Sequence, residues 1–132
     1  MAKDKTVVAY QIKANGEHQA IDMKLELSDY YKYTECDIID IVYATIGNKN
    51  YDIIVDDEGL LKSNRTFTAF TIKSGVLLAG SIVIVGSNGK GGFKSLSDKD
   101  LLNIKENLHT TEHMGNENLA PTMVEFEYAY YN

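Results

Sequence analysis

The sequence predicts an α+β fold: a single domain with a mainly antiparallel sheet of hairpins and one or two helices packed on it. Two β-branched runs bounded by turn residues, Tyr51–Val55 and Ser81–Val85, are typical of buried strands. Other runs alternate apolar and polar residues, and one later segment carries strong helix signals. A chain of 132 residues is about one domain, so we expect residues 1–132 to fold as one globular unit.

The N-terminal part predicts a β-hairpin. Thr6–Ile12 places Val8, Tyr10 and Ile12 on one face of a strand. Glu17–Met23 places Gln19, Ile21 and Met23 on one face of another. Asn15 and Gly16 lie between them, and an Asn-Gly pair supplies the two positive φ angles that a type I′ turn requires. We therefore expect two antiparallel strands joined by this turn.

The next segment predicts a short helix and a second hairpin. Leu27–Thr34 favours a helix, with Ser28 or Asp29 as its N-cap. Asp37–Ile46 then alternates like a strand, and the turn residues 47–50 return it into the buried run that follows. A second antiparallel pair is expected here.

The centre of the chain contains a further strand-like segment and a glycine-rich loop. Thr66–Lys73 has strand-like composition, although its element type stays open. Four glycines lie within Gly86–Gly92, and ordering so many glycines in a helix or strand costs backbone entropy. We expect this whole segment to be a loop.

The C-terminal part predicts the longest helix and a final strand. Ser97 is a good N-cap, and Asp98 to about Leu108 repeats apolar residues at helical spacing. A loop of about a dozen residues should follow, as far as Pro121. Met123–Tyr131 alternates with period two and predicts one strand with a solvated face.

Charge and composition exclude several classes of protein. The net charge of −6 and pI near 5.0, without a block of basic residues, oppose direct binding to nucleic acid. The longest nearly apolar run, Gly75–Gly86, is short of the roughly 20 residues that span a bilayer, so no membrane association is expected. The lone Cys36 and a start without an apolar leader favour a cytoplasmic location.

Three segments resemble known chemical motifs. The spacing of Gly86–Gly92 fits neither the Walker A loop nor the dinucleotide fingerprint. His109 and His113 match the letters of the inverted zincin motif, but this motif needs a continuous helix and a third zinc ligand. Residues 56–58 are acidic without the spacing of a calcium loop. We therefore expect no metal, no cofactor and no catalytic residue.

Arg65 is the main candidate for a binding residue because it is the only arginine in the chain. Its planar fork can bind a carboxylate or phosphate at two points, whereas the alternative is a structural contact with a carboxylate or carbonyl of its own loop. Tyrosines near the C-terminus would also suit an interface. The residues that we expect to bind a ligand or partner are Arg65, Asn64, Asp57, Glu58, Lys90 and Tyr131.

Part of the chain resembles a bacterial and phage family known as domain of unknown function 3846. The resembling segments are Asp56–Lys62, the pair Asn64-Arg65, Leu78–Gly86 and Phe93–Asp98. The resemblance covers about Ile38–Leu108. It implies a setting in phages or other mobile genetic elements, and it implies no particular activity.

The leading hypothesis from the sequence is a non-enzymatic binding protein of a phage or mobile element that inhibits a host defence enzyme. One alternative is a protein that binds or sequesters a nucleotide-like anion through Arg65 and the glycine-rich loop. Another is a zinc-dependent hydrolase that uses His109 and His113. The expected partners are a host protein or a small anionic ligand, and a homo-oligomer is compatible with the sequence.

Overall fold

The described residues form two sheets and two α-helices. The structure, a computed structural model, describes residues 5–62, 65–73, 75–90, 92–111 and 118–131. The larger sheet contains β1 (Thr6–Ile12), β2 (His18–Lys24), β3 (Ile39–Ile46), β4 (Lys49–Asp56), β7 (Ile82–Ser87), β8 (Phe93–Lys94) and β11 (Tyr128–Tyr131). The smaller sheet contains β5 (Phe67–Thr71), β6 (Gly75–Ala79), β9 (Leu108–Thr110) and β10 (Leu119–Glu125). The helices are α1 (Leu27–Thr34), α2 (Asp98–Glu106) and a 3-10 turn, η1 (Gly59–Leu61).

The pairing of strands confirms the predicted α+β class with a mainly antiparallel sheet. The larger sheet has the order β11-β3-β4-β7-β1-β2, with β8 paired to β7, and the smaller has the order β6-β5-β10-β9. Among the described pairs, only β5 and β10 run parallel. Neither α-helix in the described chain has the length and apolar character that crossing a membrane requires.

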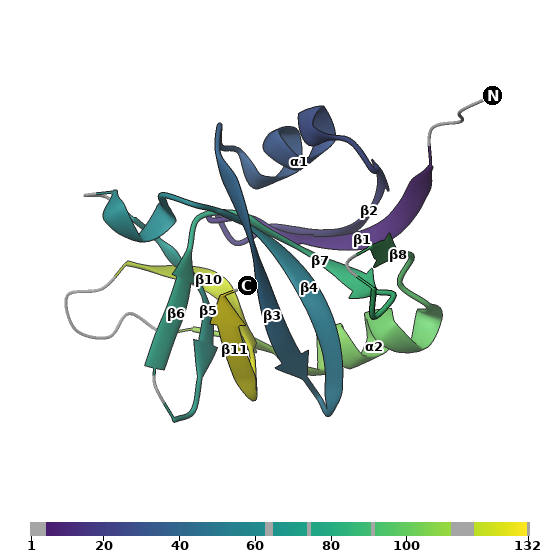
Figure 1. Cartoon of the computed structure of the whole chain (residues 1–132). Helices are drawn as coiled ribbons and strands as arrows, with labels where there is room; N and C mark the ends of the chain where they lie inside the picture. Colours follow the sequence, from purple (N-terminus) through teal and green to yellow (C-terminus); the bar gives the residue numbers. More distant parts are fainter. Residues whose placement is uncertain (1–4, 63–64, 74, 91, 112–117, 132) are drawn as a thin grey trace.

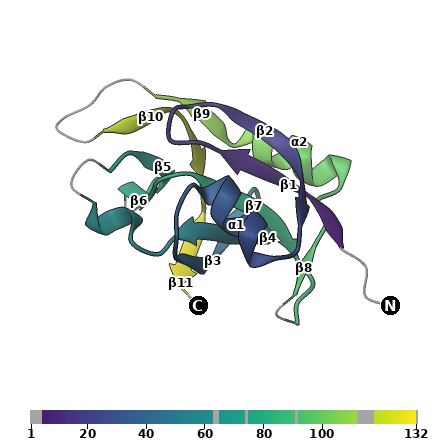
Figure 2. The ribbon, with the colours of Figure 1, turned by 90° about the horizontal axis from the view of Figure 1, so that it is seen from above.

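The larger sheet is the middle layer of the molecule. Figure 1 shows α1 on one of its faces, with the smaller sheet and α2 on the other. Alternation along β4 explains this, because Ile53 packs towards the smaller sheet and α2 while Ile54 packs towards α1. Seen from above, α1 lies over β4 and β7 (Figure 2).

The N-terminal hairpin is confirmed, but its predicted turn type is wrong. The amide of Lys13 donates to the Glu17 carbonyl at 2.8 Å, and the amide of Gly16 donates to the Lys13 carbonyl at 2.9 Å. Gly16 has a φ of 94°, whereas Asn15 does not have a positive φ. The loop therefore has three residues and uses one left-handed glycine instead of the two positive φ angles of a type I′ turn.

A turn with two positive φ angles instead closes the β3–β4 hairpin. Ile46 pairs with Lys49, so only Gly47 and Asn48 connect the strands. Their φ angles are 54° and 69°, as a type I′ turn requires.

The two helices begin differently. For α1 the prediction of Ser28 or Asp29 as N-cap is wrong, since Glu26 occupies this position without a side-chain cap. The Asp29 carboxylate instead accepts from the Lys24 amide at 2.8 Å. For α2 the predicted Ser97 cap is confirmed, and it forms a capping box.

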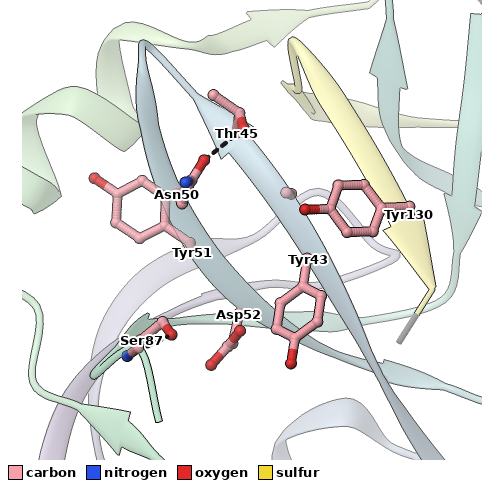
Figure 3. Close-up of a pocket in the computed structure, with 9 residues that line it drawn as sticks. Tyr43, Thr45, Asn50, Tyr51, Asp52, Ser87 and Tyr130 are labelled. Atoms are coloured by element: carbon pink, nitrogen blue, oxygen red, sulfur yellow. Dashed lines mark hydrogen bonds between the residues drawn. The ribbon is translucent and has the colours of Figure 1, made fainter. Parts of the chain in front are cut away.

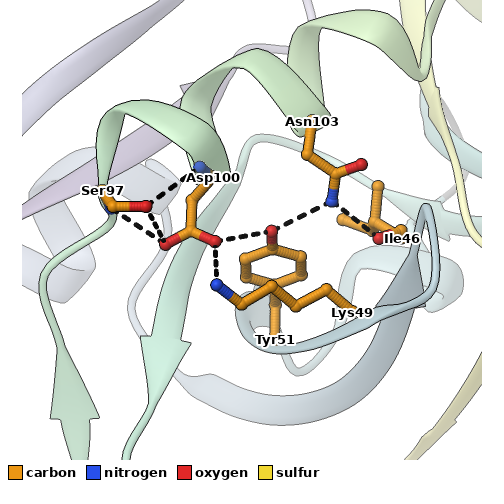
Figure 4. Close-up of polar contacts among 6 residues, drawn as sticks. All are labelled: Ile46, Lys49, Tyr51, Ser97, Asp100 and Asn103. Carbon is orange, nitrogen blue, oxygen red and sulfur yellow. Dashed lines mark hydrogen bonds and ion pairs between the residues drawn. The ribbon is translucent and has the colours of Figure 1, made fainter.

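A buried polar network attaches α2 to the β3–β4 hairpin (Figure 4). One oxygen of Asp100 accepts from Lys49 Nζ and from the Tyr51 hydroxyl, and the other accepts from Ser97. Asn103 donates to the Tyr51 hydroxyl at 3.0 Å and to the Ile46 carbonyl at 2.8 Å. The network explains how the carboxylate of Asp100, 4% exposed, remains paired inside the protein.

Two other predictions need correction. Gly86 and Ser87 belong to β7 and pair with Lys94 and Phe93 of β8, so the first two residues of the expected loop lie in a β7–β8 hairpin. The helix α2 ends at Glu106, and the segment expected to be only a loop contains β9 and the start of β10. The predictions used glycine and proline as loop signals from the neighbouring sequence alone. Pairing with neighbouring strands decides whether these residues lie in a sheet.

The C-terminal segment is two strands and not one. β10 belongs to the smaller sheet, and the chain crosses to the larger sheet at Phe126 and Glu127. The amide of Phe126 donates to Phe70 of the smaller sheet, whereas the amide of Glu127 donates to Thr45 of the larger. Phe126 is fully buried, so its burial in the shared core anchors this crossing.

Candidate functional site

Beyond the end of α1, the face of the larger sheet becomes polar. On β3 and β4, Ile41 pairs with Ile54 under the helix, and the next pair on the same face is Tyr43 with Asp52. Tyr43 also pairs with Tyr130 of β11. A row of Tyr130, Tyr43 and Asp52 therefore crosses three neighbouring strands.

Asp52 is the unusual member of this row. The residue is only 2% exposed, and its Oδ1 atom has no hydrogen-bond partner among the described residues. Burial raises the pKa of the Asp52 carboxyl, and the Ser87 hydroxyl acts in the opposite direction by favouring the ionised form. A buried carboxylate oxygen without a partner is costly, which makes this position a candidate for binding.

Two tyrosines form the open side of the site. The rings of Tyr43 and Tyr130 have centroids 5.8 Å apart and an angle of 60° between their planes. Tyr130 is 64% exposed, and Tyr128 on the same strand is 56% exposed. Since β11 is an edge strand of the larger sheet, these aromatic side chains are accessible to a partner.

A hollow of about 240 Å³ lies over the row, and we call it the Asp52 hollow. It is lined by Tyr43, Ala44, Thr45, Asn50, Tyr51, Asp52, Ser87, Gly89 and Tyr130. Figure 3 shows Asp52 between Ser87 and Tyr43, with Tyr130 beyond Tyr43. The Thr45 hydroxyl donates to the Asn50 side-chain oxygen at 2.7 Å along the same side. The described lining residues include one acidic side chain and no basic one, so the hollow favours a cation over an anion.

Arg65, the main candidate from the sequence, lies away from this hollow. Its Nη1 atom donates to the Leu60 carbonyl at 2.5 Å, and its guanidinium carbon lies 5.2 Å from the centre of the Phe67 ring. This is the structural alternative stated above, a contact with a carbonyl of its own loop. Arg65 also lines a separate hollow of about 270 Å³.

The charges around Arg65 are mixed. Lys62 and Arg65 line its hollow together with Glu35 and Asp56, and Lys62 Nζ lies 2.6 Å from an Asp56 oxygen. Glu58 lines an adjoining hollow that shares Asp56 and Lys62. Two cations facing two carboxylates give no clear preference for an anionic ligand.

The other predicted binding residues do not form one cluster with Arg65. Asp57 is exposed beside η1, Asn64 lies outside the described residues, and of Tyr131 only the backbone, paired with Val42, is described. Lys90 is exposed in the β7–β8 loop. This loop and the Arg65 hollow lie at opposite ends of β7, roughly 17 Å apart at strand spacing, so they cannot hold one small anion together.

The first residue of the histidine motif, His109, does not lie in a helix. His109 lies on β9, and its Nε2 atom contacts the Glu125 carboxylate at 2.8 Å. Glu112 and His113 lie outside the described residues. Within the described ranges, no group of three or more histidine, cysteine, aspartate or glutamate side chains is arranged to hold a metal.

The sequence contained one signal for the site that our interpretation missed. Asp52 interrupts the apolar run Tyr51–Val55, a strand buried on both faces. A charged residue in such a run must be paired, neutral or functional. Tyr43 and Tyr130 carried no comparable signal, because only the pairing of β3 with β11 brings them together.

Comparison with protein families gave a match over most of the chain. A family model described as "Domain of unknown function (DUF3846)" matches residues 7–109. The match confirms the resemblance, and it also includes the N-terminal hairpin that precedes Ile38. Comparison with curated proteins and with solved structures gave no match.

Proposed function

Since the chain belongs to the DUF3846 family, whose description names no activity, we propose a function from the site itself: a non-enzymatic binding protein that engages a partner protein through β11. The observation that carries this proposal is the exposure of Tyr128 and Tyr130 on an edge strand, next to the Asp52 hollow. Aromatic side chains that are more than half exposed cost little to desolvate and contribute large contact areas in interfaces.

The setting that we propose is a phage or other mobile genetic element acting in the cytoplasm. In this setting the partner would be an enzyme of a host defence system, which the protein inhibits by occupying its surface. The net charge of −6 supports a partner with a basic contact surface, because complementary charge accelerates association.

Binding of a nucleotide-like anion is a weaker proposal. The Asp52 hollow presents a carboxylate, and its volume is below the roughly 300 to 1,000 Å³ of pockets that enclose drug-sized ligands. The Arg65 hollow offers mixed charge, as described above. We therefore propose a protein partner in preference to a small anionic ligand.

The test is a comparison of two matched surface variants. Tagged wild-type protein is expressed in the bacterial host, the partner that it retains is identified by mass spectrometry, and its Kd is then measured with purified components. Tyr130→Ser should weaken binding by at least about tenfold, as loss of an aromatic hot spot does. Leu102→Ser on α2, where the side chain is 59% exposed, should leave the Kd unchanged. If both variants weaken binding equally, or if neither variant weakens it, the proposed surface is refuted.

A further inference from the structure

The unpaired oxygen of Asp52 needs a hydrogen-bond donor that the described residues do not supply. Asp52 is almost fully buried, and the described residues that line the Asp52 hollow include no lysine, arginine or histidine. Leaving a buried carboxylate oxygen unpaired destabilises the folded protein, because the oxygen has lost its water without gaining another donor. A cationic donor from outside the chain would remove this cost.

The walls of the hollow favour a flat cation. The rings of Tyr43 and Tyr130 border it on two neighbouring strands, and aromatic faces attract cations, arginine more often than lysine. A guanidinium group carries five donors in one plane, so it can bind the Asp52 oxygen and a hydroxyl or amide oxygen of the lining at once. Asn50, Thr45 and Ser87 place such oxygens in the same lining.

The volume of the hollow limits the size of the group that enters it. About 240 Å³ suits the end of one side chain and is small for a nucleotide or peptide segment. A second copy of this chain is a poor source of the group, because the only arginine, Arg65, already donates to the Leu60 carbonyl and lies against Phe67.

From these contacts we propose that the Asp52 hollow binds the guanidinium group of an arginine side chain on the partner protein. The arginine pairs with Asp52 Oδ1 and packs against Tyr43 and Tyr130. This inference rests on the proposed function, since it names the residue of the partner that the tyrosine surface receives.

The first experiment uses a probe that carries only the proposed group. N-acetyl-arginine amide is titrated into ¹⁵N-labelled protein, and the amide signals of Ser87 and Gly89 are followed by NMR. We expect saturable shifts with a Kd in about the millimolar range, because one side chain makes few contacts. The citrulline analogue, which has the same shape without charge, should bind at least about tenfold more weakly.

The matched variants are Asp52→Asn and Asp22→Asn, which remove the same charge from the hollow and from an exposed position on β2. Asp52→Asn should abolish the shifts, and Asp22→Asn should retain them. If Asp52→Asn does not fold, the ¹³C signal of the Asp52 carboxyl in the wild type decides, since bound arginine should lower its pKa. No saturation at roughly 100 mM probe, or equal binding of the citrulline analogue, would overturn the inference.

The two proposals fail in different ways. A partner that is lost by Tyr130→Ser but kept with unchanged Kd by Asp52→Asn would overturn the arginine site and leave the binding surface standing. Saturable binding of the probe, without any partner that depends on Tyr130, would support the cation site and refute the proposed function.

Discussion

Replacing Asp100 by asparagine should lower the free energy of unfolding by about 2 kcal/mol at neutral pH. Burial raises the pKa of Asp100, but hydrogen bonds from Lys49, Ser97 and Tyr51 outweigh it and lower the pKa to about 2. The ordinary value is 3.8, and each pKa unit corresponds to about 1.4 kcal/mol once both folded and unfolded states are ionised. Asparagine also places an amide NH₂ against groups that donate to the carboxylate, which adds to the loss.

The sign of this contribution makes it testable by pH. Because the folded pKa of Asp100 lies below the unfolded one, its stabilisation is full above the unfolded pKa and is lost as the pH falls towards 2. At pH 3 about half of the part of this difference that comes from ionisation of Asp100 should have disappeared. The measurement is urea unfolding of both proteins at several pH values between 3 and 7, followed by circular dichroism.

A variant in the same helical turn serves as the control. Asp98→Asn removes an exposed charge from the start of α2, which is worth at most about 1 kcal/mol through the helix dipole. If Asp100→Asn costs no more than Asp98→Asn, or if its cost is the same at pH 3 and pH 7, the ionised Asp100 carboxylate does not stabilise the fold through this network.

Five other substitutions test four separate parts of the structure. Gly47→Ala should destabilise the protein by roughly 2–5 kcal/mol, because a Cβ at this position would lie 2.0 Å from Asn103 Oδ1. Gly89→Ala is the control: Gly89 also has a positive φ but has open space around it, so the substitution should cost only about 1–2 kcal/mol. Equal melting temperatures of the two variants would contradict this prediction. Phe126→Ala should cost roughly 3–5 kcal/mol in chemical unfolding, and a loss below about 1 kcal/mol would show that the crossing between sheets is not anchored there. Arg65→Lys should lower the free energy of unfolding by at most about 1 kcal/mol in the same assay, since the hydrogen bond to Leu60 is exposed. If the substitution instead weakens partner binding by more than it lowers stability, Arg65 lies in an interface. For Asp52→Asn, the stability relative to wild type should increase as the pH rises from 3.8 towards neutral. The reason is that the folded pKa of Asp52 is raised, so ionisation of Asp52 destabilises the folded wild type and the asparagine variant avoids this loss. A difference in stability that does not vary with pH would contradict this prediction.

The sequence by itself determined those helices and strands whose signals come from residues close together in the chain. The Ser97 cap depends on residues within one helical turn, and the strand Thr6–Ile12 follows from the strand-forming residues of its own run, although the structure buries both of its faces. Both predictions were confirmed. The type I′ turn was assigned to the wrong hairpin because Asn15-Gly16 and Gly47-Asn48 both permit positive φ, and the register of the paired strands decides how many residues each loop contains.

Tertiary structure alone decided the C-terminal segment and the site. Met123–Tyr131 alternates without a break, yet the chain changes sheets at Phe126 because that side chain fills the core between the two sheets. Nothing in the spacing of Tyr43, Asp52 and Tyr130 indicates that they are neighbours, since strand pairing joins residues that are distant in sequence. The charge of Asp52 was visible in its apolar run, but its lack of a partner is a property of the packed sheet, in which no described donor reaches Oδ1.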